Sequence, residues 1–222
     1  MRRLTPGGDT LDKITITLYD VVGYVIPGFL CLLSVAIFLV FLTGNPICLT
    51  VIYDLNIFWQ IGVAYIVGHL IQAVVSILWK NNYDVDLTYR NVSQEVFAKF
   101  KQNVSCYIGG SDVGQHDILI LENNILDDKI STKVSMFRAF QGLYKGTIGV
   151  LGISILEALY LLFFSSSRYF TIKDTTVSAG NASLITVLIV LSGMFLISVI
   201  RHNAFIRSRI RTIISYYVGR NV

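Results

Sequence analysis

Four long apolar segments dominate this chain, and they restrict the folds that it can adopt. They cover residues 24–42, 57–78, 148–164 and 184–200 and contain almost no charged side chain. Each is close to the ~20 residues that an α-helix needs to cross about 30 Å of hydrocarbon. We therefore expect an all-α membrane protein with four transmembrane helices.

The lysines and arginines indicate the direction in which the chain crosses the membrane. Sixteen of the 18 fall in the N-terminal segment, between the second and third apolar segments, or in the C-terminal tail. Only Arg168 and Lys173 lie in the other two connections. Because basic residues stay on the cytoplasmic side, we expect a multi-pass protein of the cell inner membrane with both termini in the cytoplasm. The net charge of +4 then reflects topology, and we expect no direct contact with nucleic acid.

Residues 1–23 form an N-terminal segment that begins polar and becomes amphipathic. Ile14, Leu18 and Val22 recur at helical spacing, with polar side chains on the opposite side. This pattern is typical of a helix that lies on a membrane surface. Acidic residues interrupt the stretch and the apolar run starts late, so it does not read as a cleavable signal peptide.

The first span is expected to be kinked where it enters the bilayer, at Gly23, Pro27 and Gly28. Proline removes a backbone donor and clashes with the preceding turn, which bends a helix. The first two spans then occupy residues 24–79, separated by an outer turn at residues 43–46.

Residues 80–143 are too many for a simple connection and are predicted to form a helical cytoplasmic subdomain between spans 2 and 3. Residues 91–107 and 129–144 carry apolar side chains at helical spacing, on either side of a glycine-rich break. The second of these helices is expected to continue directly into the third span. Spans 3 and 4 occupy residues 144–200, with a polar outer loop at residues 165–182.

Residues 201–222 form a basic tail that is expected to continue the fourth span as a helix. Its basic side chains include Arg201, Arg207, Arg209 and Arg211. Two roles remain open for these residues. They attract anionic lipid, which is worth about 1 kcal/mol per basic side chain near the surface, or they dock a cytoplasmic protein.

Three polar residues within the spans are the main candidates for a functional role. His69 and Gln72 lie one turn apart in the second span, and Glu157 lies near the middle of the third. Ionisable side chains at membrane depth are costly and usually face the interior of the bundle. Because these helices run antiparallel, His69 and Glu157 are predicted to lie at similar depth and to form a hydrogen bond. That bond either fixes helix packing, or belongs to a proton- or voltage-sensitive element or to the polar lining of an oligomeric pore.

We expect no catalytic residues, no cofactor and no metal site. One histidine and one carboxylate are fewer than the three or four ligands that zinc requires. Serines within membrane helices normally bond to their own backbone or permit close packing. Ser76 is the serine nearest to His69 on the same face, but it lies about 10 Å away along the helix, too far for nucleophile activation.

Two short motifs resemble those of a known group of membrane proteins. The sequence YDVVGYVIPG at residues 19–28 and the pattern GHxxQ at residues 68–72 are similar to those of small bacterial four-span inner-membrane proteins of anti-phage defence systems, such as the membrane subunit of the Kiwa system. The resemblance implies a partner-bound sensor or effector at the inner membrane.

The sequence favours a non-enzymatic membrane module that oligomerises and binds a cytoplasmic partner through residues 80–143 and 201–222. Its expected role is to sense or permeabilise the inner membrane in anti-phage defence. Small residues on the second and third spans permit the close helix approach that a homo-oligomer needs: Gly62, Gly68, Ala73, Gly149, Gly152 and Ala158. The second hypothesis is a stand-alone ion channel or small-solute transporter that uses His69, Gln72 and Glu157. The third is a membrane-embedded enzyme that acts on lipid.

Overall fold

The computed structural model describes residues 21–78, 94–105, 107, 113, 115–165, 169–172 and 175–219. The predicted surface helix within residues 1–23 lies outside this part, apart from its last three residues. The first 14 residues of the predicted subdomain, 80–93, also lie outside it.

Four helices are long and apolar enough to cross a membrane, as the sequence predicted. The first is α2 (Ile26–Thr43), which the π-helical turn η1 (Val21–Val25) precedes. The second is α4 (Ile57–Leu78). The third and fourth are α8 (Asp128–Phe163) and α9 (Asn181–Gly219), which are far longer than one span.

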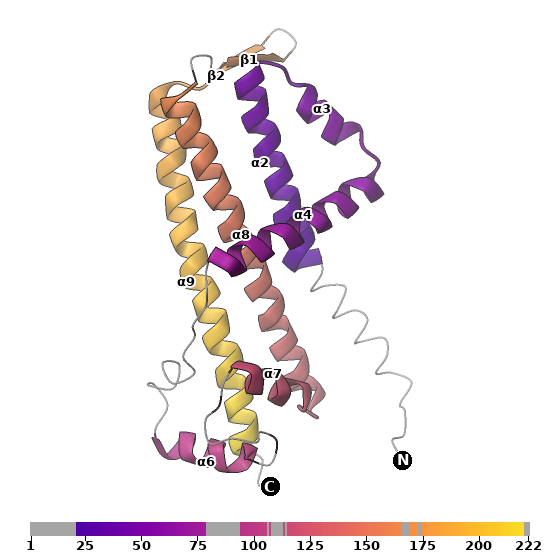
Figure 1. The fold of residues 1–222 in the computed structure, drawn as a ribbon, viewed down its shortest axis with the longest axis vertical. Helices are drawn as coiled ribbons and strands as arrows, with labels where there is room; N and C mark the ends of the chain where they lie inside the picture. The colour runs from indigo at the N-terminus through magenta and orange to yellow at the C-terminus, as the bar shows by residue number, and fades with distance from the viewer. Residues whose placement is uncertain are drawn as a thin grey trace.

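The long helices α8 and α9 lie side by side and form the main axis of the molecule (Figure 1). Helix α2 packs against α8 over its apolar part. After the turn at Gly44, the short helix α3 (Ile47–Asp54) leads to α4, which crosses α2 and α8 obliquely (Figure 1). Helices α3 and α4 together therefore return the chain from the end of α2 to its beginning.

Glycines let α2, α4 and α8 approach until their backbones touch. A Cβ atom on Gly28 would lie 1.7 Å from the Ala64 carbonyl oxygen, and one on Gly68 would lie 2.0 Å from the Tyr24 carbonyl oxygen. A Cβ atom on Gly146 would lie 2.6 Å from the Pro27 ring. No larger residue fits at these positions unless the backbone moves. Pro27 and Gly28, which belong to the predicted entry kink, are therefore contact points between helices.

The loop at residues 165–182 contains a β-hairpin, so the prediction of an all-α fold was wrong in this segment. Strand β1 (Tyr169–Ile172) pairs antiparallel with β2 (Thr175–Ser178), and Ile172 lies opposite Thr175. Both strands are rich in β-branched and aromatic residues, which favour extended structure. The hairpin lies at the end of the molecule where α2 finishes and α9 starts (Figure 1).

The opposite end of the molecule has its own hydrophobic core, which we call the α6–α7 core. It joins α6 (Gln94–Val104), α7 (Gln115–Asn123), the start of α8 and the end of α9. Its buried residues are Phe100, Val104, Val113, Ile118, Leu121, Ile125, Val134, Ile206, Ile210, Ile213, Ile214 and Tyr217. The predicted loop subdomain and the predicted tail therefore share one core, in which the tail isoleucines are buried.

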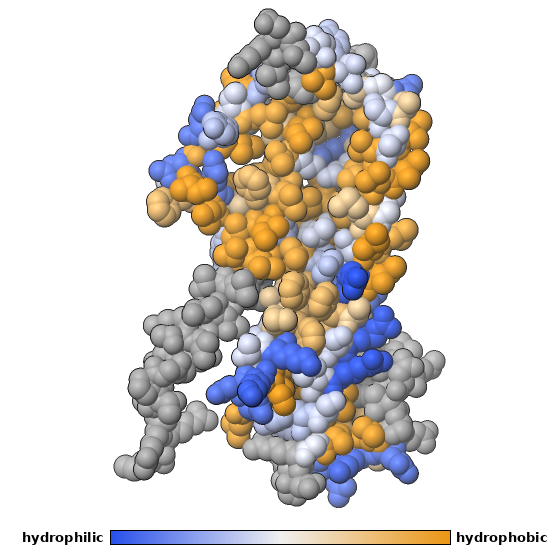
Figure 2. Space-filling view, turned by 180° about the vertical axis from the view of Figure 1, so that it is seen from behind, coloured by the Kyte–Doolittle hydropathy of each residue, from blue (hydrophilic) through white to orange (hydrophobic). Residues whose placement is uncertain are grey.

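Two predictions about helix continuity are confirmed. The helix that begins beside the α6–α7 core runs without a break through the third apolar segment, and the fourth apolar segment continues into the tail. The side chain of Asp127 caps the first of these helices by accepting from the backbone N–H groups of Lys129 and Ile130. On the face drawn in Figure 2, hydrophobic residues cover most of the middle of the molecule and the part below the hairpin, whereas many hydrophilic residues gather toward the opposite end.

We predict that Gly68→Ala destabilises the protein, whereas Gly62→Ala does not. The new methyl group at residue 68 would meet the backbone of Tyr24, and such overpacking costs about 1–3 kcal/mol. Nothing lies within 4 Å of a Cβ atom at residue 62, and alanine is the better helix former. Thermal unfolding in one detergent compares the two variants, and equal melting temperatures would contradict the packing described above.

Candidate functional site

A large groove lies between α2, α8 and α9. Its volume is about 550 Å³, and Ser178 and Ala179 lie at its outer end, beside the hairpin. Both α2 and α9 pack on α8, so α8 forms the floor and the other two helices form the walls. The lining is almost wholly aliphatic or aromatic, with contributions from residues such as Leu30, Phe38, Leu151 and Val187.

A small polar cluster lies within this apolar groove. The Ser34 hydroxyl on α2 donates a hydrogen bond of 2.6 Å to Oε2 of Glu157 on α8. The hydroxyl groups of Ser34 and Ser154 lie 2.7 Å apart. Ser154 and Glu157 are three residues apart, which places them on one face of α8. Among the described residues that line the groove, Glu157 is the only ionisable one.

From the sequence, span serines are expected to bond to their own backbone or to permit close packing, and this cluster shows a third arrangement. Ser76 follows the expectation, because its hydroxyl donates to the Gln72 carbonyl four residues earlier. Ser34 instead bonds across to another helix. Its sequence context gave no sign of this, because the pairing depends on which face of α2 packs against α8.

The predicted hydrogen bond between His69 and Glu157 is not formed. The His69 ring stacks on Tyr24, with ring centroids 3.7 Å apart, and meets the edge of Tyr65. Tyr24 and Ser34, the neighbours of His69 and Glu157, are ten residues apart, which is about 15 Å along a helix. The prediction treated both helices as upright, but α4 runs obliquely, so counting residues gave the wrong depth.

Gln72 has a structural role in holding three segments together. It is buried, and its side-chain Nε2 donates to the carbonyl oxygens of Gly23 in η1 and Gly142 in α8. His69 lies exposed on the outer side of α4, Gln72 lies inside the bundle, and Glu157 lies in the groove. The three predicted candidates therefore do not share a path through the protein.

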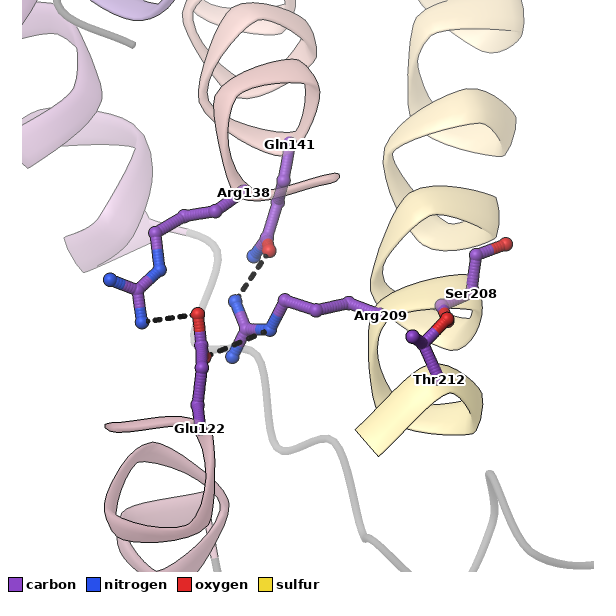
Figure 3. A network of polar contacts seen from close by, with 6 residues as sticks. All are labelled: Glu122, Arg138, Gln141, Ser208, Arg209 and Thr212. Carbon is purple, nitrogen blue, oxygen red and sulfur yellow. Dashed lines mark hydrogen bonds and ion pairs between the residues drawn. The ribbon is translucent and has the colours of Figure 1, made fainter. Parts of the chain in front are cut away.

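A second polar cluster connects α7, α8 and α9 beside the α6–α7 core (Figure 3). Glu122 of α7 forms an ion pair of 2.8 Å with Arg138 of α8, and its other oxygen lies 3.6 Å from Nε of Arg209 on α9. Arg209 also donates a hydrogen bond of 2.9 Å to Gln141. The Glu122 side chain is only 8% exposed, so this network supplies counter-charges to a buried carboxylate.

The four arginines singled out in the tail do not share one environment. Arg201, Arg207 and Arg211 are exposed and can face lipid or a partner. The Arg209 side chain is only 15% exposed, and it contacts Glu122 and Gln141. The expectation that Arg209 faces lipid or a partner was therefore wrong, because its position on α9 turns it toward α7 and α8.

Within the described residues, no group of three or more histidine, cysteine or acidic side chains is placed to hold a metal ion. No family model, no curated protein and no solved structure matches this chain.

We predict that Arg209→Ala destabilises the α6–α7 core by about 1–3 kcal/mol, since it takes a partner from a buried carboxylate. Arg211→Ala serves as the control, because it removes the same charge from an exposed site two residues away on the same helix. Limited proteolysis between α6 and α8 measures the difference. If both variants are cut at the same rate, the network does not hold this end of the molecule together.

Proposed function

We propose that this chain is a non-enzymatic, multi-pass module of the bacterial inner membrane. In this proposal it oligomerises through its spans and binds a cytoplasmic partner through the α6–α7 core and the tail. Its role is to sense or permeabilise the membrane, and the resemblance of the motifs at residues 19–28 and 68–72 supports a role in anti-phage defence.

The observation that carries the proposal is the continuity of α8 and α9. Each helix runs from the apolar end, where the groove lies, into the α6–α7 core. Helices are stiff and pack as rigid bodies, so a tilt or rotation at the apolar end moves core residues such as Val134 and Ile213 at the other end. This arrangement suits the transfer of a change in the membrane to a bound protein.

Oligomerisation is supported by small residues on the spans that do not pack against another helix of the same chain. Gly68 and Gly149 are in contact with Tyr24 and Ile71 of the same chain, so they are not available to a second copy. Gly62 and Gly152 have nothing within 4 Å of a Cβ atom. Such open faces allow the helices of two copies to approach closely.

Partner binding is supported by the basic residues that remain exposed on α9, namely Arg201, Arg207 and Arg211. They suit an acidic protein surface, and at the membrane they also suit anionic lipid. A channel is less well supported, because His69, Gln72 and Glu157 line no common path. A lipid-acting enzyme is also less well supported, because Ser76 bonds to Gln72 and Lys145 and not to His69.

The proposal predicts that a change in the bilayer alters the stability of the α6–α7 core. Purified protein is placed in bilayers of short and of long acyl chains, and amide hydrogen exchange is measured in α6 and α7. Coupling energies of about 1–3 kcal/mol correspond to changes in exchange of roughly 5- to 150-fold. Unchanged exchange in the wild-type protein would contradict the proposal.

A helix-breaking variant tests the route of this coupling. Asn203 and Ala204 lie on α9 between its apolar part and the α6–α7 core. The double variant Asn203→Gly with Ala204→Gly loosens the helix there and is expected to reduce the response to bilayer thickness. The control Asn203→Ala keeps the helix and is expected to respond as the wild type does. A full response in the glycine variant would show that α9 does not carry the change.

A further inference from the structure

The groove between α2, α8 and α9 combines features that are seldom found together in a membrane protein. Its walls are mostly apolar, but a carboxyl group lies inside it, and the described residues that line it include no lysine or arginine. A carboxylate at membrane depth is costly without a positive partner. Ser34 donates to Oε2 of Glu157, and the hydrogen bonds of the described residues include none to Oε1.

We propose that this groove binds small lipophilic cations, with the Glu157 carboxylate as their counter-charge. The volume of about 550 Å³ is in the range of drug-sized ligand sites, roughly 300–1,000 Å³. The aliphatic walls take the apolar body of the ligand. Phe38 and Phe41 add aromatic rings to the lining, and such rings attract cations.

The charges of the chain itself argue against a second copy as the occupant. The apolar parts of α2, α4, α8 and α9 contain no lysine or arginine. The only basic side chain in these parts of the helices is His69, and it lies at a different depth from Glu157. The apolar parts of these four helices in a second copy therefore bring no lysine or arginine to this carboxylate.

The size of the groove argues against a helix of another protein. An α-helix with its side chains is about 10–12 Å across, so about 10 Å of its length takes up roughly 800–1,100 Å³. This is more than the groove volume of about 550 Å³. A compact organic cation fits that space.

Binding of tetraphenylphosphonium to the purified full-length protein in detergent tests this site by equilibrium dialysis. We expect saturable binding with one site per chain. The anion tetraphenylborate has nearly the same shape and apolar surface, so it is the matched control ligand, and we expect no saturable binding of it. Glu157→Gln is expected to weaken tetraphenylphosphonium binding about tenfold or more, because it removes the counter-charge.

Two further variants separate charge from shape. Asp54→Asn removes a carboxylate at an exposed position on α3, outside the groove, and is expected to bind as the wild type does. Val187→Trp fills the groove from the α9 wall without touching the carboxyl group, and is expected to abolish binding. The Glu157→Gln variant keeps a side-chain oxygen that can accept a hydrogen bond from Ser34. Gel filtration confirms that each variant is folded.

The proposal fails if the wild type shows no saturable binding, or if tetraphenylborate binds equally well. It also fails if Glu157→Gln and Val187→Trp bind as tightly as the wild type, because the cation then only partitions into detergent and apolar surface. These measurements need no partner and no intact coupling between the two ends of the molecule. Their failure is therefore distinct from the failure of the membrane-module role.

Discussion

The structure depends on the close contact of η1 and α2 with α4 and α8, which needs glycine at residues 28, 68 and 146. Gly28 and Gly68 lie against backbone atoms of the neighbouring segment, and Gly146 lies against the Pro27 ring. Contact at this range brings the carbonyl oxygens of Gly23 and Gly142 within reach of the Gln72 side chain, so one buried amide bonds to both neighbouring segments. The same contact fixes which face of α2 meets α8, and it thereby places Ser34 against Glu157. A buried hydrogen-bonding group that loses its partner has no water to replace it. The contacts of Gln72 therefore fix how the neighbouring helices are arranged.

The two ends of the molecule are built on different physical principles and are joined by shared helices. At the apolar end, helices meet through small residues and a few polar contacts, as is typical of membrane bundles. At the other end, aromatic and branched side chains such as Phe100 and Tyr217 fill a core of the kind found in water-soluble proteins. The pair Glu122 and Arg209 lies beside that core. Helices α8 and α9 belong to both ends, so a movement of either helix at one end also displaces its residues at the other.

Hydropathy predicted the elements of this fold well and their relative placement less well. The four apolar helices, the turn at Gly44 and the continuity of α8 and α9 follow from runs of residue types, which a single sequence displays directly. The oblique path of α4 does not, because an apolar run gives the length of a helix and not its angle. That angle is the reason why His69 meets Tyr24 rather than Glu157. Arg209 was misplaced for a similar reason, since its surroundings come from α7, which is distant in sequence. The hairpin was missed although its β-branched residues were a visible signal.

The account requires that the hairpin and the α6–α7 core lie on opposite sides of a membrane, with the core inside. Single cysteines at Thr176 and Lys99, two exposed positions at these two ends, test this directly in a chain without its native cysteines. In intact spheroplasts, a membrane-impermeant thiol reagent is expected to label Thr176→Cys, and to label Lys99→Cys only after the membrane is lysed. Labelling of both positions before lysis, or of Lys99→Cys alone, would contradict the topology on which the account is based.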